Sequence, residues 1–426
     1  VVFLPPAQNL FEPTKELLSR YAASSSHIRV RLVDPEKNPV ETERLVRQYN
    51  VTAPGVVVAS GNDRRVIDSN DLGEFDYSGM QFGQQPQMTG FKGEQLVTSA
   101  LLQLAEGRKP KVLFTTGHGE HTLDDNGPHG LSGAQELLGR DNFDIQEWAS
   151  LGKPVPPGTD LVVVAGPTSS FVKPELDALT SYVESGGRVL VLLDPTLGQT
   201  PGTGLVSTGL EGWLSGYGVK VGQNIVVDPS NPLPFFGAET IAVKDYVEHP
   251  ITKPLKQGNL PILMSLVRSI GAATQNGATG LAATELMRTS AQGWGETDLE
   301  HLEKVARDDK DLAGPVPLGV AIEKKGAPAP AGAPPVRAAR IVAFGDSDFA
   351  TNQLLQANVA NSVLLADSLN WLVEREALLG IPPKKTEQVH LSLTQQQLRA
   401  VYLLTLVLLP GLAVAGGVFV YFRRRR

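Results

Sequence analysis

The segment KVLFTTGHGEH, residues 111–121, ends an apolar run with two histidines, a glutamate and two glycines. Its apolar half predicts a buried strand. The loop after that strand then holds five candidate site residues: Gly117, His118, Gly119, Glu120 and His121. Imidazole and carboxylate groups bind metals or transfer protons, and glycine N–H groups bind anions. The segment therefore predicts an active site or a binding site at the end of a strand.

Three more segments place polar residues directly after predicted strands. They are AGPTSS at 165–170, LLDPTLG at 192–198 and FGDSDFATN at 344–352. In open parallel sheets, ligands bind outside the carboxyl ends of the strands. We therefore expect one shared crevice at this edge of the sheet. Its candidate lining residues are His118, Glu120, His121, Asp194, Asp346 and Asp348.

One interpretation of these residues is a metal site. His118 and His121 are suitable nitrogen ligands, and Asp124, Asp125 and His129 offer further ligands nearby. The His-x-x-His spacing differs from the i, i+4 pair of histidines that binds zinc on a helix. The two histidines are therefore weak candidates, and no metal ligand is assigned.

A second interpretation is a hydrolase or amidotransferase, in which a nucleophile follows a strand on a tight turn. The chain contains no cysteine and no Gly-x-Ser-x-Gly motif. Thr168, Ser169 and Ser170 follow a predicted strand, but the sequence identifies no base partner for them. No catalytic residue is therefore predicted.

Two further interpretations need no catalysis. Backbone N–H groups at Gly117 and Gly119 could bind an anion or a glycan. Alternatively, the glycines form tight turns, and the aspartates cap helices or bond to loop backbone. Asp346-Ser347-Asp348, directly before a predicted helix, fits capping well. The sequence leaves these alternatives open.

The elements that position these residues alternate in type from residue 109 to about 380. Apolar runs predict strands at 111–115, 143–146, 161–165, 188–193, 225–227, 262–267, 318–322 and 340–344. Helical spacing predicts helices at 130–138, 173–184, 206–217 and 354–374. Such alternation indicates a parallel sheet with helices on both faces. The Pro/Ala/Gly-rich residues 326–335 predict a loop between two late strands.

Residues 1–108 predict a smaller α/β module. Strands are predicted at 1–4, 28–33, 55–59 and 64–68, and helices at 9–23, 39–49 and 93–106. Residues 70–90, rich in Gly, Gln and Asp, predict a long surface loop. The order of elements, with Pro54 before a predicted hairpin, resembles a thioredoxin fold. The Cys-x-x-Cys motif of that fold is missing, so a redox role is excluded.

The charge balance narrows the range of partners. The chain has 426 residues and a net charge of −7. No basic stripe is present to neutralise phosphates, which argues against a nucleic-acid partner. No Gly-x-x-x-x-Gly-Lys-Ser/Thr motif occurs, so any ATP hydrolysis must take place on another protein.

The C-terminal region predicts a membrane anchor. Residues 400–422 form an uncharged apolar stretch that is long enough to cross a bilayer as a helix. Arg423 to Arg426 follow it, and the positive-inside rule places this basic tail, 423–426, in the cytoplasm. Residues 381–399 are predicted to form a stalk. The modules before the stalk are then expected in the periplasm, at a bacterial inner membrane.

The segments KVLFTTGHGEH, ALTSYVESGGRVLVLLDP and RIVAFGDSDFATN, in this order and ahead of the predicted membrane helix, resemble the GldG-like family. Its members are auxiliary, substrate-binding-like components of ABC transporters, first linked to gliding motility. The resemblance implies an ABC-2-type permease and a cytoplasmic ATPase as partners. It implies a middle domain similar to flavodoxin-like or glutamine-amidotransferase-like folds without their catalytic cysteine. It also implies a further membrane helix before Val1.

We therefore expect a non-enzymatic, membrane-anchored accessory subunit of an ABC transporter, which binds a substrate or couples to other envelope proteins. We expect no cofactor. The assembly state, a homodimer or a multi-subunit complex, stays open. The alternative is a membrane-anchored periplasmic metal-dependent hydrolase or glycan-binding protein that uses His118, Glu120 and His121.

Overall fold

The computed structural model describes most of the chain up to residue 375. The described residues are 1–6, 8–34, 37–49, 51, 54–61, 63–76, 87–106, 108–198, 204–230, 240–273, 280–302, 305–326, 337–357, 359–375 and 384–385. The chain forms two compact units, Val1–Lys384 and Lys385–Arg426. The predicted membrane span at 400–422 lies outside the described residues, as does the predicted stalk at 381–399 apart from residues 384–385. None of the helices within the described ranges is long and apolar enough to span a bilayer.

The first module is built on a small antiparallel sheet. Its strands are β1 (Val2–Phe3), β2 (Gly55–Ser60) and β3 (Asp63–Asp68), in that order. Neighbouring residues of a strand point to opposite faces. Val2 and Val56 therefore pack with α1 (Phe11–Ser24) and α4 (Gly93–Glu106), whereas Phe3 and Val57 pack with α2 (Pro39–Tyr49). The module thus has helices on both faces of its sheet, and its thioredoxin-like character stays a prediction.

Two predictions for this module are wrong. Residues 28–33 do not form a strand, because Leu32 makes only an isolated parallel bridge to Val2. Residues 70–90 are not a continuous loop, because α3 (Ser69–Leu72) leads into β4 (Gly73–Asp76), which pairs with β5 (Gln87–Phe91). The Gly- and Gln-rich composition gives no strand signal, since backbone pairing rather than an apolar pattern forms this hairpin. The short strand β21 (Lys384–Lys385) joins the same sheet next to β5.

The larger module contains a mixed ten-stranded sheet. Eight strands follow the order β10-β15-β19-β20-β9-β8-β6-β7, and β16 and β13 pair off this path. Their bounds are β6 Lys111–Thr115, β7 Asp144–Trp148, β8 Leu161–Ala165, β9 Arg188–Leu192, β10 Val219–Val221, β13 Asp245–Tyr246, β15 Ile270–Ala272, β16 Leu281–Arg288, β19 Pro317–Lys324 and β20 Ala339–Phe344. The run from β7 to β20 is parallel throughout.

The prediction of a wholly parallel sheet is wrong beyond β20. There, β19 runs antiparallel to both β20 and β16. A parallel pair needs a crossover connection, usually a helix. The sequence between β19 and β20 contains GAPAPAGAPP, a composition typical of a loop rather than of a crossover helix.

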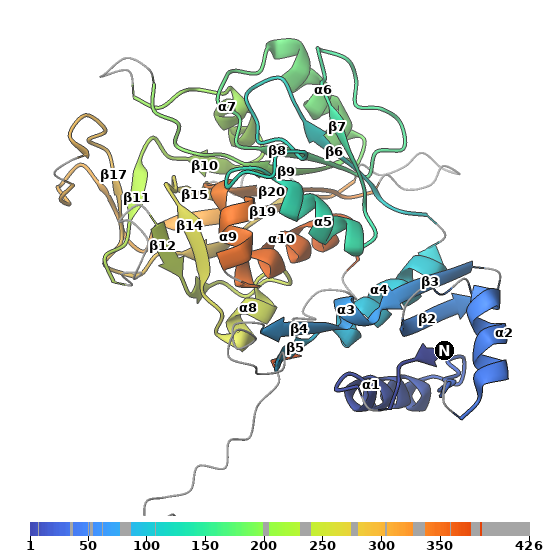
Figure 1. Cartoon of the computed structure of the whole chain (residues 1–426). Helices are drawn as coiled ribbons and strands as arrows, with labels where there is room; N and C mark the ends of the chain where they lie inside the picture. Colours follow the sequence, from blue (N-terminus) through green and yellow to red (C-terminus); the bar gives the residue numbers. More distant parts are fainter. Residues whose placement is uncertain are drawn as a thin grey trace, which may run out of the picture. The chain divides into compact units, whose positions relative to one another are not determined.

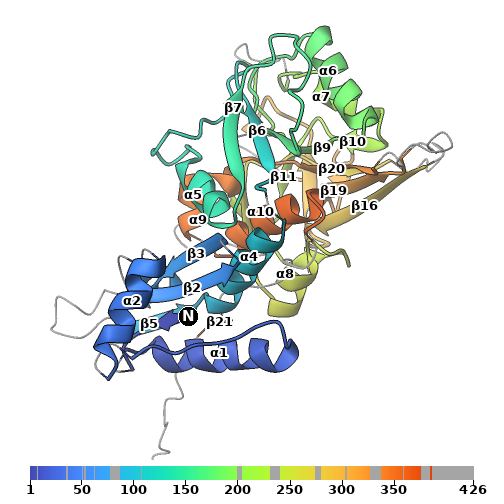
Figure 2. The same cartoon turned by 90° about the vertical axis from the view of Figure 1, so that its right-hand side faces the viewer.

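Helices cover both faces of this sheet (Figures 1 and 2). One face packs against α5 (Ser132–Arg140), α9 (Asn352–Ala357) and α10 (Val359–Leu372). The other face packs against α6 (Lys173–Glu184) and α7 (Leu210–Ser215). Helices on both faces explain why β8 and β9 are buried at every position.

One helix is shorter than its sequence pattern predicts. The pattern indicates 206–217, but α7 begins at Leu210. Gly209 precedes it with a φ of +84°, which a helix cannot contain. The Glu211 carboxylate accepts hydrogen bonds from the N–H groups of Thr208 and Gly209, which fixes this start.

The remaining elements are small and were not all predicted. β11 (Ile225–Val227), β17 (Trp294–Glu296) and β18 (Leu312–Ala313) form one sheet, and β12 (Thr240–Val243) pairs with β14 (Ile262–Ser265). A helix, α8 (Lys253–Gly258), and a 3-10 helix, η3 (Asp348–Ala350), complete the described elements. Strands of two to four residues carry too little periodicity to be recognised from sequence.

Asp141, which follows α5, gives a pH prediction for the fold. Burial raises its pKa to about 6, although a hydrogen bond from Gln95 and the charge of Arg375 both act to lower it. A raised carboxyl pKa stabilises the fold at low pH, and this stability is lost as pH rises from about 4 to about 6. We expect the free energy of unfolding of Asp141→Asn at pH 7 to exceed that of the wild type by roughly 1–3 kcal/mol. We also expect it to decrease less than that of the wild type as pH rises from about 4 to about 6. Urea unfolding at several pH values measures both effects.

The matched control is Asp309→Asn, because Asp309 is exposed. It should leave the pH dependence of unfolding as in the wild type. Equal stability of Asp141→Asn and wild type at pH 7 and at pH 4 would show that burial of Asp141 carries no such cost.

Candidate functional site

The loops after β6, β8, β9 and β20 meet at the carboxyl edge of the parallel strands. The His121 N–H donates to the Ala165 carbonyl at 3.0 Å, and His121 Nε2 lies 2.9 Å from Ser347 Oγ. Both the N–H and the Oγ of Ser347 donate to the Asp194 carboxylate. The predicted convergence of these loops is therefore present. The polar side chains form two groups, which we call the His118 cluster (His118, Glu120, Ser150, Glu175) and the Ser347 cluster (His121, Asp194, Asp346, Ser347).

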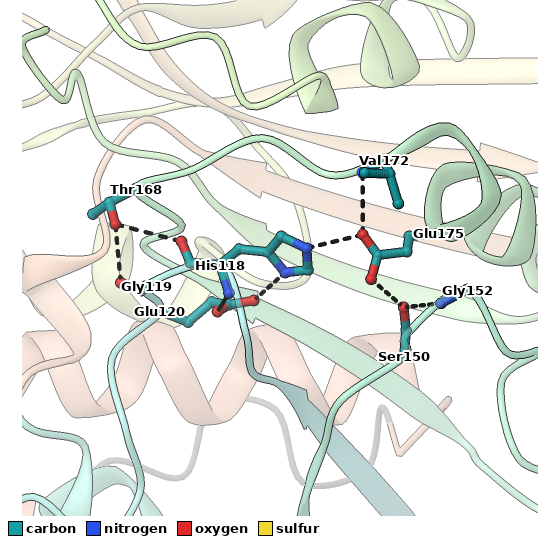
Figure 3. Close-up of polar contacts among 8 residues, drawn as sticks. All are labelled: His118, Gly119, Glu120, Ser150, Gly152, Thr168, Val172 and Glu175. Atoms are coloured by element: carbon teal, nitrogen blue, oxygen red, sulfur yellow. Dashed lines mark hydrogen bonds and ion pairs between the residues drawn. The ribbon is translucent and has the colours of Figure 1, made fainter.

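In the His118 cluster, an imidazole lies between two carboxylates (Figure 3). His118 Nδ1 is 3.3 Å from Glu120 Oε1, and His118 Nε2 is 2.9 Å from Glu175 Oε2. The His118 ring also stacks on Phe171, with ring centroids 3.8 Å apart. All three charged or titratable residues are buried, with exposed fractions of 9% for His118, 8% for Glu120 and 5% for Glu175.

Glu175 joins three segments of the chain. It lies in the first turn of α6, where Pro174 also favours the helix start. Its carboxylate accepts hydrogen bonds from Ser150 Oγ at 2.8 Å and from the Val172 N–H at 3.1 Å. Burial opposes ionisation, but the bonds from Ser150, Val172 and His118 prevail and lower the pKa of Glu175. The carboxylate therefore holds the loop after β7 and the start of α6 against the loop after β6.

Two glycines let the backbone pass close to these groups. Gly119 has a φ of +77°, and a Cβ there would lie 2.0 Å from Thr168 Oγ1. Gly166 has a φ of +68°, and a Cβ there would lie 2.6 Å from Ser347 Oγ. The N–H groups of Thr168 and Ser169 both donate to the His118 carbonyl, at 2.8 and 3.0 Å. Close packing of the loops therefore requires glycine at both positions.

Two residues of the Ser347 cluster are fully buried, whereas His121 and Asp194 are half-buried. Ser347 and Asp346 each have an exposed fraction of 0%. The Asp346 carboxylate accepts hydrogen bonds from the N–H groups of Asp348 at 2.9 Å and Phe349 at 3.1 Å. These bonds agree with the interpretation in which aspartates bond to loop backbone. Burial, and then the charges of Asp194 and Asp348, raise the pKa of Asp346 well above its usual range.

The hydrogen-bond pattern at Ser347 is not that of an activated nucleophile. A serine hydroxyl has one proton, and here that proton is donated to Asp194. His121 Nε2 must then donate to Ser347 Oγ, whereas a general base would accept its proton. Buried and bonded in this way, Ser347 joins the loops after β9 and β20. Burial also raises the pKa of Asp194, against the hydrogen bonds from Ser347.

The two histidines that were weak metal-ligand candidates have different partners. The ring nitrogens of His118 face Glu120 and Glu175, whereas His121 Nε2 faces Ser347. These nitrogens therefore do not face a common position for a metal ion. In the part of the chain that the structure describes, no group of three or more His, Asp and Glu side chains could hold a metal ion. The other nearby candidates also lie apart. Exposed His129 is 3.7 Å from Asp348, and Asp125 accepts the Gly127 N–H.

Several contacts at this edge were not predicted. Ser150, Glu175 and Ser347 complete the two clusters, and Asn352 holds the loop before α5. Asn352 accepts the Gly133 N–H at 2.7 Å and donates to the Gly127 carbonyl at 2.8 Å. A glutamate in the first turn of a helix indicates a cap, which is a sequence signal for the helix start at Glu175 but not for its contact with His118.

With the geometry established, the relation to known proteins can be stated. The family described as an ABC-type uncharacterized transport system matches residues 109–373, more than half of the chain. The chain belongs to this family. The resemblance to ABC transporter auxiliary proteins is therefore confirmed, and the chain is an auxiliary component of an ABC-type transport system. No curated protein sequence matches the chain.

Solved structures resemble this auxiliary protein only weakly. The N-terminal domain of mmIFT52 is 19% identical, with a TM-score of 0.43 over 62% of this chain and 97% of that one. A thua-like protein from Bacteroides uniformis ATCC 8492 is 14% identical, with a TM-score of 0.36 over 62% of this chain and 91% of that one. Exo-beta-1,4-mannosidase Op5Man5 from Opitutaceae bacterium strain TAV5 is 15% identical, with a TM-score of 0.30 over 69% and 40%. These likenesses are too weak to bear on function.

Gly119 gives a stability prediction for the site. Gly119→Ala places a methyl group against Thr168 Oγ1 and requires a left-handed backbone, so we expect a loss of roughly 2–4 kcal/mol of unfolding free energy. Combining it with Thr168→Ala removes the clash but not the backbone strain. The double variant should therefore be more stable than the sum of the two single changes indicates, as measured by urea unfolding. Strictly additive losses would contradict close contact between these loops.

Proposed function

We propose that the chain is a non-catalytic accessory subunit of an ABC transporter, anchored in a bacterial inner membrane with its folded modules in the periplasm. The observation that carries the proposal is the family match over residues 109–373. In this account residues 1–108 form a thioredoxin-like module, 109–380 form the α/β domain, and 381–399 form a stalk. The subunit binds a substrate or couples transport to other envelope proteins.

The sequence of the C-terminal region supports the anchor. Residues 400–422 carry no charge and are long enough to cross a bilayer as a helix. Four arginines follow directly, and such basic flanks stay in the cytoplasm. A span in this orientation leaves the modules that precede it on the periplasmic side and presents an apolar helix to the membrane part of a permease.

The contacts at the carboxyl edge support a non-catalytic role. The candidate residues bond mainly to one another or to loop backbone, and Ser347 directs its proton to Asp194. The sequence also lacks the phosphate-binding motif of ATPases. ATP hydrolysis is therefore assigned to a separate cytoplasmic ATPase, and the transmembrane path to an ABC-2-type permease.

The proposal predicts stable partners in the native membrane. The full-length protein, extracted in mild detergent and purified by an affinity tag, should bring down a permease and an ATPase in stoichiometric amounts, as identified by mass spectrometry. Leu408→Arg introduces a charge into the apolar stretch and should remove both partners, because a charge in the bilayer centre is costly.

The control for that experiment is Leu312→Arg. Leu312 is exposed in β18, so the variant should retain both partners. Recovery of the wild-type protein alone, or an equal yield of partners with Leu408→Arg, would contradict the proposed anchor and assembly.

A further inference from the structure

The small sheet of the first module ends in a strand with a free edge. β3 pairs with β2 on one side, and among the described residues no strand pairs with its other side (Figure 1). Val57 of β2 exchanges both of its backbone hydrogen bonds with Val1, so its backbone groups point away from β3. Val66 lies directly opposite Val57, so its N–H and C=O likewise point away from β2. By the same alternation, so do the N–H groups of Arg64 and Asp68.

Three exposed side chains lie along this free edge, on one face of the sheet. Arg64, Val66 and Asp68 alternate with the less exposed Arg65 and Ile67, and Val66 is 40% exposed. The Asp68 carboxylate makes no capping bond at the start of α3. Within the ranges that the structure describes, neither Arg64 nor Asp68 has a side-chain ion pair. Their Cα atoms are about 13 Å apart along the strand, with Val66 between them.

The order of charges along this edge is complementary to itself. When a second copy pairs its β3 antiparallel, with Val66 opposite Val66, Arg64 of each copy lies opposite Asp68 of the other. Opposite charges in directly facing positions stabilise a strand pair. The two Val66 residues exchange backbone hydrogen bonds and cover each other's exposed side chain. Registers centred on Arg64 or on Asp68 would instead place like charges opposite each other.

The same pattern favours a second copy over a strand of another protein. Edge strands usually carry features that prevent pairing with another chain, such as a proline or charges that repel a second copy. β3 contains no proline, and the charges on either side of Val66 attract their counterparts in a second copy. A strand of another protein would have to match both charges and their spacing.

We propose that β3 is a dimer interface, at which two copies of the chain pair antiparallel about Val66 and join their small sheets into one. The proposal goes beyond the accessory role in transport, because that role requires no self-association. Pairing over residues 64–68 alone buries little surface, so the dimer is expected to be weak and to depend on protein concentration. Its charged contacts lie at the surface, so added salt should weaken it further.

The mass of the full-length protein, produced without other subunits and purified in mild detergent, tests this interface. Light scattering over a range of protein concentrations should show a monomer–dimer equilibrium. Arg64→Asp and Asp68→Arg each place like charges opposite each other at both ends of the strand pair, so each should raise the Kd of the dimer by about tenfold or more. Both positions are exposed, so both variants should fold. Arg307→Asp, the same change at an exposed arginine of the larger module, should leave the Kd unchanged.

A mixture of the two single variants tests the register. In a dimer of Arg64→Asp with Asp68→Arg, each pair of facing positions again holds opposite charges. The mixture should therefore associate with nearly the wild-type Kd, although each variant alone does not. The double variant, with both changes in one chain, should dimerise for the same reason.

Three outcomes count against the proposal. A wild-type protein that stays monomeric at every concentration would overturn it. A dimer that persists unchanged in both single variants would overturn it as well, because a contact elsewhere in the chain then holds the two copies together. Failure of the mixed variants to associate would contradict the antiparallel register about Val66. Neither a permease nor an ATPase takes part in these measurements, so their outcome is independent of the proposed function.

Discussion

The parallel pairing of five strands is the constraint on which the site depends. β7, β6, β8, β9 and β20 run in one direction, so all their carboxyl ends lie at one edge of the sheet. Helices on both faces exclude water from β6, β8, β9 and β20, so polar groups appear where these strands end. This arrangement brings His121 and Ser347, 226 positions apart in the chain, within hydrogen-bonding distance.

At that edge, residue types suited to catalysis hold loops together. Buried polar groups are costly unless they are hydrogen-bonded, and both clusters satisfy this requirement with side chains from different loops. The Glu175 carboxylate alone makes hydrogen bonds with the His118 ring, the Ser150 hydroxyl and the Val172 N–H. The membership of the ABC-type transport system family and the geometry of the edge therefore support the same account.

Much of the fold could be predicted where local patterns are strong. β6, β8, α2, α4 and α6 begin and end at the predicted residues, because continuous apolar runs and clear helix starts define them. β16 was missed, since its half-buried residues carry no clear alternation and its pairing with β19 is remote in sequence. In the site, the convergence of loops followed from strand direction alone. The partners Ser150, Glu175 and Ser347 could not be predicted, because tertiary packing, not sequence spacing, selects them.

The central claim is that the geometry of this edge is structural rather than catalytic, and the free energy of unfolding of Ser347→Ala tests it most directly. The Ser347 hydroxyl donates to Asp194 and lies 2.9 Å from His121 Nε2, so its removal deletes both contacts. The account predicts a loss of about 1–3 kcal/mol. Residues kept for catalysis often cost stability, and their replacement commonly stabilises a protein. Unchanged or increased stability of Ser347→Ala would therefore contradict the account.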